Sequence, residues 1–386
     1  MRRVFGLSVA LVAYTVVGYP LLTLLAARLR PRPLRRRATP LPTVTLVISA
    51  YNEAESIAGK LDNCLETDYP LELLEVIVVS DGSDDGTDHV AARSGVTVLH
   101  ERERRGKAAA LARGAAVASG DVLVFSDANN LYGAGTIGAL VAPFADPDVG
   151  VVTGRKAIDA GTGRLLDRLE GLYWRYESAL KTWESGAGSV AAVVGEALAL
   201  RREAFRRPPE GTINDDFVIA MTAAETGWRL VYAPDAISTE PASATVADEA
   251  VRRTRIVAGR WQALGAVLPG LLRRRPLFAL QVVSHKGLRP LVPFAIAAAT
   301  VSGATRRRGL GRALLLVQAA FLAAAAAGAA VERAGGRRRV VLYAPYYLVK
   351  MQLSAVRGLV EARRSGDGAL WARVRRGEPV TPDRRG

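Results

Sequence analysis

The chain has 386 residues, enough for two or three compact domains with a large core. Lys and Arg number 52 against 37 Asp and Glu, and this surplus of 15 suits an anionic partner such as nucleic acid, phospholipid or a phosphorylated substrate. Much of it lies in arginine runs beside apolar stretches, without zinc-finger spacing or a basic stripe interleaved with aromatics, so we expect membrane lipids and no nucleic acid as partners. The single Cys64 excludes an intramolecular disulfide and a multi-cysteine metal site.

The first predicted element is a transmembrane helix, in a segment assigned to residues 1–37 together with a basic linker. Residues 4–27 carry no charge and are long enough to cross a bilayer. The alternative is a cleaved signal peptide, but its apolar core would be shorter and a small-residue cleavage site would follow. Here six arginines follow, against two before the run, which predicts a cytoplasmic position for the next domain: Arg28, Arg30, Arg32, Arg35, Arg36 and Arg37.

Residues 38–250 have the sequence pattern of a soluble α/β domain. Short Val- and Ile-rich runs at 44–48, 75–79, 121–125 and 149–153 alternate with helix-like stretches at 54–66, 87–94 and 107–119. This pattern predicts βαβ units in a mainly parallel sheet, with ligands at the carboxyl ends of the strands.

The remainder divides into an amphipathic interfacial segment at 251–288, transmembrane helices within 289–360 and a basic tail at 361–386. The apolar stretches are 290–305, 313–331 and 340–360, of which the first is short and the last contains Lys350 and Arg357. If all three crossed the bilayer, the arginine-bearing tail would lie outside. One of them is therefore expected to be re-entrant or interfacial.

Polar loops follow the first two predicted strands. Residues 49–53 and 80–87 are runs of small and acidic side chains, which at the edge of a parallel sheet form a crevice for a base, a ribose and phosphate. Asp84 and Asp85 are equally well explained as turn and cap residues. A third strand leads to Asp127, which can coordinate a divalent ion that bridges two phosphates. Lys107 opens a helix and either faces phosphate or belongs to a solvated basic helix start.

Two further pairs carry possible chemistry. Asp215 and Asp216 precede an apolar helical run; N-capping explains one of them, and the other can act as a general base. Arg260 and Trp261 offer a fixed cation and a flat apolar surface, which suit a diphosphate and a sugar ring. Interfacial anchoring explains the Arg-Trp pair as well.

These loops, in this order, resemble glycosyltransferase family 2, whose members include cellulose, chitin, hyaluronan and poly-N-acetylglucosamine synthases. The resemblance covers about 43–264 and implies an α/β GT-A fold, Rossmann-like with a mainly parallel sheet, plus transmembrane α-helices. It implies inverting transfer with Mg or Mn, bound by Asp127 and Asn129, and catalysis by Asp216 as base with Asp215 beside it. By the same resemblance the nucleotide-sugar contacts are Ala50, Tyr51, Glu53, Asp81, Lys107, Asp127, Arg260 and Trp261.

Three positions depart from the family pattern. The metal motif usually reads Asp-x-Asp and here ends in Asn129, which lowers the expected metal affinity. Val257 stands where the Gln of the Gln-x-x-Arg-Trp signature belongs, which puts processive polymer synthesis in doubt. Glu196, in the region of the acceptor floor, is interpreted as a partly exposed structural glutamate.

The sequence thus predicts a multi-pass cell-membrane glycosyltransferase with a cytoplasmic catalytic domain. It would move a sugar from a nucleotide diphosphate sugar, expected to be UDP-linked, to a hydroxyl of a polysaccharide or a lipid-linked acceptor. Two rival hypotheses are a membrane transporter or channel with a nucleotide-sensing domain, and a catalytically inactive nucleotide-binding scaffold. The transporter predicts facing ionisable residues within the spans, and the scaffold has no need of Asp216.

Overall fold

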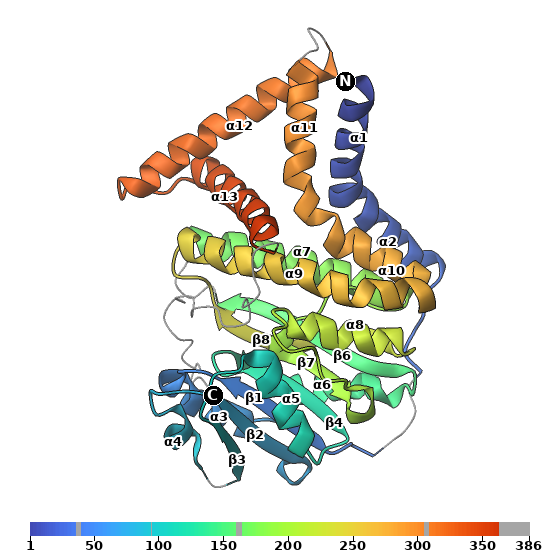
Figure 1. Ribbon diagram of the computed structural model, residues 1–386, viewed down its shortest axis with the longest axis vertical. Helices are drawn as coiled ribbons and strands as arrows, with labels where there is room; N and C mark the ends of the chain where they lie inside the picture. Colours follow the sequence, from blue (N-terminus) through green and yellow to red (C-terminus); the bar gives the residue numbers. More distant parts are fainter. Residues whose placement is uncertain (36–39, 94, 160–163, 305–308, 363–386) are drawn as a thin grey trace.

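An eight-stranded mixed sheet forms the centre of the domain after the first membrane helix (Figure 1). The computed structural model describes residues 1–35, 40–93, 95–159, 164–304 and 309–362. The strand order is β3-β2-β1-β4-β7-β6-β8-β5. The strands are β1 (Val44–Ala50), β2 (Leu74–Asp81), β3 (Val96–Glu101), β4 (Val122–Asp127), β5 (Leu131–Tyr132), β6 (Val149–Asp159), β7 (Leu198–Arg201) and β8 (Arg229–Pro241).

The first half of the sheet is parallel and the second half is mixed. Strands β3, β2, β1 and β4 run parallel to one another, and β6 runs parallel to β8. Strand β7 is antiparallel to both β4 and β6, and β5 is antiparallel to β8. The four predicted apolar runs all lie in strands, and their side chains are buried on both faces, as in β1, where Leu46 and Val47 are fully buried. Apolar runs of this kind are typical of strands with both faces covered.

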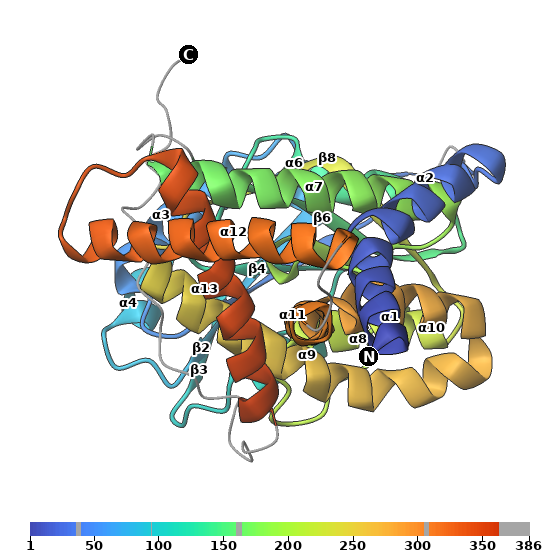
Figure 2. The ribbon, with the colours of Figure 1, turned by 90° about the horizontal axis from the view of Figure 1, so that it is seen from above.

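Two long helices, α7 (Leu165–Ala187) and α9 (Val246–Arg274), form a layer between the sheet and the membrane helices (Figures 1 and 2). Helix α9 contains residues 251–274 of the predicted amphipathic segment 251–288, and residues from Pro276 onward belong to a candidate membrane span. The helix buries its apolar side, including Val257, Leu264 and Leu271. The helices of the sheet domain are α3 (Ala54–Leu65), α4 (Thr87–Ala91), α5 (Lys107–Val117), α6 (Thr136–Val141) and α8 (Asp215–Glu225).

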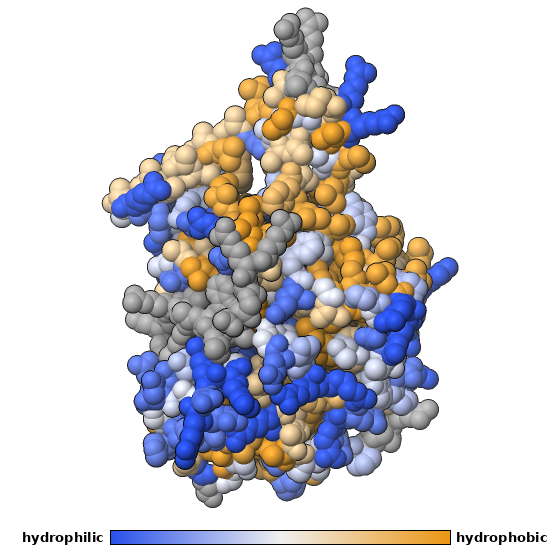
Figure 3. Space-filling view, viewed as in Figure 1, coloured by the Kyte–Doolittle hydropathy of each residue, from blue (hydrophilic) through white to orange (hydrophobic). Residues whose placement is uncertain are grey.

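Three helical stretches are long and apolar enough to cross a membrane, within the described part of the chain: Arg2–Leu29, Pro276–Ala304 and Gly311–Arg333. They comprise α1 (Arg2–Ala13), α2 (Tyr19–Leu29), α10 (Pro276–Val282), α11 (Val292–Ala304) and α12 (Leu310–Arg333). Apolar surface gathers over these helices and gives way to hydrophilic surface over the sheet domain (Figure 3). The α/β fold with added membrane helices is therefore confirmed.

Helix α13 (Val340–Glu361) covers the last of the three C-terminal apolar stretches, one of which the sequence predicts to be re-entrant or interfacial. It is not among the three stretches long and apolar enough to cross a membrane, and it packs on the α7 and α9 layer through Tyr343, Tyr347 and Met351. In the described structure α13 is thus a helix docked on the sheet domain. Of the predicted charged segments, Arg36, Arg37, the run 306–308 and the tail from residue 363 lie outside the described residues.

Candidate active site

The loop after β2 is fixed by Asp81. Its carboxylate accepts hydrogen bonds from the backbone amides of Arg105 at 2.8 Å and Gly106 at 2.7 Å. Gly82 follows with φ +70°, and a Cβ there would lie 2.7 Å from the backbone nitrogen of Arg104. Asp81, predicted to hold the nucleoside, therefore also holds the segment that leads into Lys107. It lines a cavity of about 540 Å³ beside α5.

The other predicted nucleoside contacts lie close to that loop and line neither this cavity nor the one that contains Lys107. The Arg104 guanidinium lies 3.7 Å from the centre of the Tyr51 ring. Glu53 is buried at the start of α3 and accepts from the Ser56 hydroxyl at 2.5 Å, and Ala50 is buried at the end of β1. The carboxylates of the 84–85 pair accept from Asn52 and from backbone amides, as turn residues do.

Lys107 and Asp127 meet in a second cavity, of about 250 Å³, between the sheet and the α7 and α9 layer. The Lys107 ammonium lies 2.5 Å from Asp127 Oδ1. Burial lowers the pKa of the ammonium, but the charge of Asp127 and then that of Asp215 outweigh it, so the pKa of Lys107 is raised and the group stays charged. The predicted phosphate-facing lysine and the predicted metal ligand are therefore direct partners.

Asp215 and Asp216 begin α8 and line the same cavity. The amide of Phe217 donates to Asp216 Oδ1 at 2.7 Å, while Asp215 Oδ2 is buried without a hydrogen-bond partner among the described residues. Burial first, and then the neighbouring charge of Asp215, raise the pKa of Asp216 to about 7. A carboxylate with a pKa near neutrality, at the edge of a cavity, is suited to act as a general base.

The Arg-Trp pair on α9 is split by the geometry of the helix. Arg260 lines the cavity, whereas Trp261 does not, and the Trp261 indole nitrogen is buried without a hydrogen-bond partner in the described structure. Successive helical residues point about 100° apart, so one helix presents only one of the two to a given cavity. The two side chains predicted to act together thus face different surroundings.

A divalent cation has few donors from the chain itself. Asn129 Oδ1 is buried and has no hydrogen-bond partner among the described residues, and Asp127 supplies a carboxylate. The described residues contain no group of three or more His, Cys, Asp or Glu placed to hold a metal. Two oxygen donors fit an ion such as Mg or Mn that is bound largely by substrate phosphates and water.

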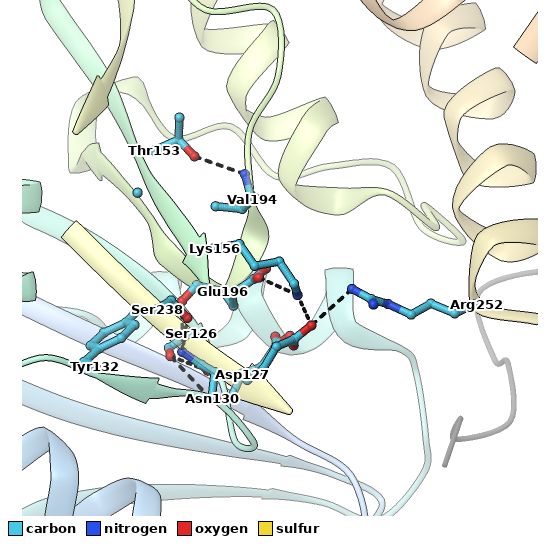
Figure 4. A network of polar contacts seen from close by, with 12 residues as sticks. Ser126, Asp127, Asn130, Tyr132, Thr153, Lys156, Val194, Glu196, Ser238 and Arg252 are labelled. Atoms are coloured by element: carbon cyan, nitrogen blue, oxygen red, sulfur yellow. Dashed lines mark hydrogen bonds and ion pairs between the residues drawn. The ribbon is translucent and has the colours of Figure 1, made fainter. Parts of the chain in front are cut away.

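Glu196 differs from the sequence interpretation: it is buried, not partly exposed. Its carboxylate lies 2.8 Å from the ammonium of Lys156, which also contacts Glu240. Arg252 on α9 in turn lies 3.2 Å from Glu240 (Figure 4). The sequence analysis missed Lys156 and Arg252 as cavity residues, because only the folded sheet and α9 bring residues so distant along the chain together.

The comparisons with known proteins agree with this geometry. Residues 45–207 match the family model described as "Glycosyl transferase family 2". A poly-beta-1,6-N-acetyl-D-glucosamine synthase from Staphylococcus aureus (strain COL) is 26% identical over 200 residues, covering 50% of this chain and 48% of the relative. An N-acetylglucosaminyltransferase from Rhizobium meliloti (strain 1021) is 28% identical over 220 residues, covering 51% of each chain. The chain spans about half the length of these curated relatives.

A solved structure matches along nearly the whole chain. It is a mannosyltransferase from Pyrobaculum calidifontis in complex with GDP-Man and Mn²⁺. It is 27% identical with a TM-score of 0.70, and the match covers 93% of this chain and 99% of that one. The predicted family and fold are confirmed by these matches: the chain carries a glycosyltransferase family 2 domain of the GT-A fold.

Proposed function

We propose that the chain is an inverting, membrane-bound glycosyltransferase that uses a nucleotide diphosphate sugar. One observation carries the proposal: a single cavity collects Lys107, Asp127, Asp215, Asp216 and Arg260 from four separate segments of a family 2 domain. Cations for a diphosphate and a carboxylate base thus share one site. A scaffold that only binds nucleotide has no use for the buried acidic pair, whose burial is costly.

In the proposed reaction Asp216 takes the proton of an acceptor hydroxyl. The acceptor oxygen attacks the anomeric carbon in line with the departing nucleoside diphosphate, one bond forms as the other breaks, and the anomeric configuration inverts. Lys107 and Arg260 bind the diphosphate and its developing charge. A divalent cation held by Asp127 and Asn129 would supply further neutralisation of the leaving group. Burial, and then the like charge of Asp215, keep the pKa of Asp216 raised.

For the metal we propose a divalent cation, and for the donor a UDP-linked sugar. The mannosyltransferase relative was solved with Mn²⁺, which supports a divalent cation in this fold and leaves both Mg and Mn as candidates here. That relative carries GDP-Man, whereas we expect a UDP-linked sugar for this chain, so both nucleotides belong in the test.

We further propose that the domain lies on the cytoplasmic face of the cell membrane. The three candidate spans, taken in order, return the chain to the side of the sheet domain after residue 333, where α13 docks. Arg337–Arg339, which precede α13, then lie on the same side as Arg30, Arg32 and Arg35 of the linker, in agreement with the positive-inside tendency. Because α13 is docked on the sheet domain, Lys350 and Arg357 do not supply the facing intramembrane charges that a transporter requires.

The test uses the full chain in membranes, incubated with a panel of radiolabelled UDP- and GDP-sugars and Mg²⁺ or Mn²⁺. Transfer of label to a lipid-extractable product indicates a lipid-linked acceptor, and transfer to high-mass material indicates a polysaccharide. Asp216→Asn is the negative control, since it should bind the donor without transfer. The absence of turnover in the wild type with every donor would overturn the proposed function.

A further inference from the structure

The cavity continues beyond the proposed donor site along one face of α7. Five residues of α7 line it at helical positions i, i+3, i+4, i+7 and i+11: Glu170, Tyr173, Trp174, Glu177 and Lys181. Helix α9 lines it at the same spacing with Glu249, Arg252, Arg253, Ile256 and Arg260, and outside this spacing with Arg255. Such spacing places each set on a single helix face, and eleven residues of helix extend over about 16 Å. These five side chains of α7 therefore form a stripe, one continuous side of the cavity.

Most charges beside this stripe are already paired within the protein. Arg252 lies 3.3 Å from Glu249, Arg253 lies 3.1 Å from the same carboxylate, and Lys156 holds Glu196 at 2.8 Å. These ion pairs account for the basic side chains that reach the α7 end of the cavity from α9 and the sheet. No separate ligand is needed to explain them.

Glu170 is the exception. Its side chain lines the cavity, the residue is 2% exposed, and neither carboxylate oxygen has a hydrogen-bond partner among the described residues. Burial, and then the charge of Glu249, raise its pKa to about 7. The nearby charges of Arg252 and Arg253 lower this pKa only in part, and neither donates a hydrogen bond to Glu170. Two buried carboxylate oxygens without a donor call for a ligand that donates to them.

Two aromatic rings flank this carboxylate on the same helix face. Tyr173 and Trp174 both line the cavity, with ring centres 5.4 Å apart and planes at 76°. A cation of the protein lies over one face of each ring, the Arg253 guanidinium 4.7 Å from the centre of Tyr173 and the Lys156 ammonium 5.2 Å from that of Trp174. Aromatic faces give flat apolar contact area, and a carboxylate accepts hydrogen bonds from hydroxyl groups. A sugar ring offers both an apolar face and hydroxyl donors. A phosphate group offers neither, and its charge would be repelled by Glu170.

We propose that Glu170, Tyr173 and Trp174 form a binding subsite for a sugar ring of the acceptor. The acceptor is then a saccharide, free or lipid-linked, and not a lipid phosphate without sugar. The inference rests on the proposed transfer reaction. It adds the chemical class of the acceptor and the part of the molecule that recognises it.

The test measures transfer by the full chain in nanodiscs, with the donor found in the panel above. Three acceptor probes are compared: short N-acetylglucosamine oligosaccharides, short mannose oligosaccharides, and a polyprenyl phosphate without sugar. Glu170→Gln should raise the KM of the saccharide acceptor about ten- to a hundredfold, the range for a lost hydrogen bond to a buried charged group. The donor KM and the slow hydrolysis of donor without acceptor should change less than about twofold.

Matched controls separate a binding role from loss of structure. Glu225→Gln removes the same charge from α8 outside the cavity and should leave the acceptor KM unchanged. Tyr173→Leu is compared with Tyr176→Leu, because Tyr176 lies on α7 with an exposed side chain and does not line the cavity. This pair tests the subsite independently if Glu170→Gln fails to fold.

The possible outcomes distinguish failure of the acceptor subsite from failure of the transferase proposal. An unchanged acceptor KM in Glu170→Gln and Tyr173→Leu, or transfer to polyprenyl phosphate while both saccharides fail, overturns the subsite and leaves the transferase proposal intact. Failure of all acceptors together with absence of donor hydrolysis overturns both proposals. Donor hydrolysis that no saccharide converts into transfer overturns the subsite alone.

Discussion

The ammonium of Lys107 lies 2.5 Å from Asp127 Oδ1, so the carboxylate expected to bind a divalent cation is already bound to a cation of the protein. The two positive charges compete for one acceptor. In the proposed reaction a diphosphate relieves this competition, because Lys107 can pair with phosphate as the metal takes Asp127. Metal binding should therefore depend strongly on the nucleotide.

Lys107→Met tests this competition directly. Without nucleotide, the variant should bind Mn²⁺ about tenfold more tightly than the wild type, since it frees Asp127 and removes a nearby positive charge. Transfer should fall, because a diphosphate contact is lost. Titration of free Mn²⁺ by electron paramagnetic resonance measures the first effect. Arg93→Met, which removes a cation paired with Asp62 on the surface, is the control and should change neither quantity.

The pH dependence of turnover should report the buried acidic pair. Asp216 must be ionised to act as base, and its pKa is raised from 3.8 to about 7, so kcat should rise with pH through about 7. Asp216→Asn should lower kcat about 10²- to 10⁴-fold with little change in donor binding. Rate measurements from pH 5 to 9 test this. A pH-independent rate, or normal turnover in Asp216→Asn, would contradict the assignment.

The raised pKa of Asp216 also predicts that stability falls with rising pH, whereas kcat rises. The folded state keeps a proton on Asp216 up to about pH 7, whereas the unfolded chain loses it near its usual pKa of 3.8. Stability contributed by this group therefore falls as the pH rises from about 4 to about 7. Asp216→Asn should melt at a higher temperature than the wild type at pH 8, with a smaller difference at pH 5. A lower melting temperature at pH 8 would argue against a costly buried carboxylate.

Much of this site was predictable because its signals are local. Asp81, Lys107 and Asp127 stand at strand or helix ends, which periodicity and loop composition reveal. Strand β8 was not predicted, since Pro234 and charged residues interrupt its pattern and its pairing with β6 and β5 defines it. The buried Glu196 also escaped, because its ion pair depends on Lys156 from another strand. The stripe on α7 does have a sequence signal, a helical spacing of acidic and aromatic residues from 170 to 181.

Gly195 lies against the proposed base. A Cβ at this position would lie 3.0 Å from Asp216 Cβ and 3.3 Å from its Cγ, tighter than ordinary van der Waals contact. Gly195→Ala should displace the carboxylate by a few tenths of an ångström and lower kcat about three- to tenfold, since reacting groups tolerate little misplacement. A Cβ at Gly138 on α6 would have no atom within 4 Å, so Gly138→Ala should leave kcat unchanged. Equal kcat values for the two variants would place Asp216 away from the reacting hydroxyl.

Three membrane crossings place some arginine runs on the sheet-domain side of the membrane and one run on the opposite side. Three crossings place the segment between α11 and α12 outside, and the arginine run of residues 306–312 extends from that segment into the first turn of α12. The positive-inside tendency opposes this placement of the run. Three crossings also put Arg30, Arg32, Arg35 and Arg337–Arg339 on the sheet-domain side, and the same tendency favours that placement. The docking of α13 on α7 and α9 fixes the end of α12 near that side, so we expect three crossings.

In sealed vesicles, an impermeant maleimide should label Arg312→Cys from the face of the membrane opposite the sheet domain. It should label Arg337→Cys from the face on which the sheet domain lies. The native Cys64 is buried and gives little background. Labelling of both cysteines from one face would show that α12 does not cross, and would move the arginine run to the cytoplasmic side.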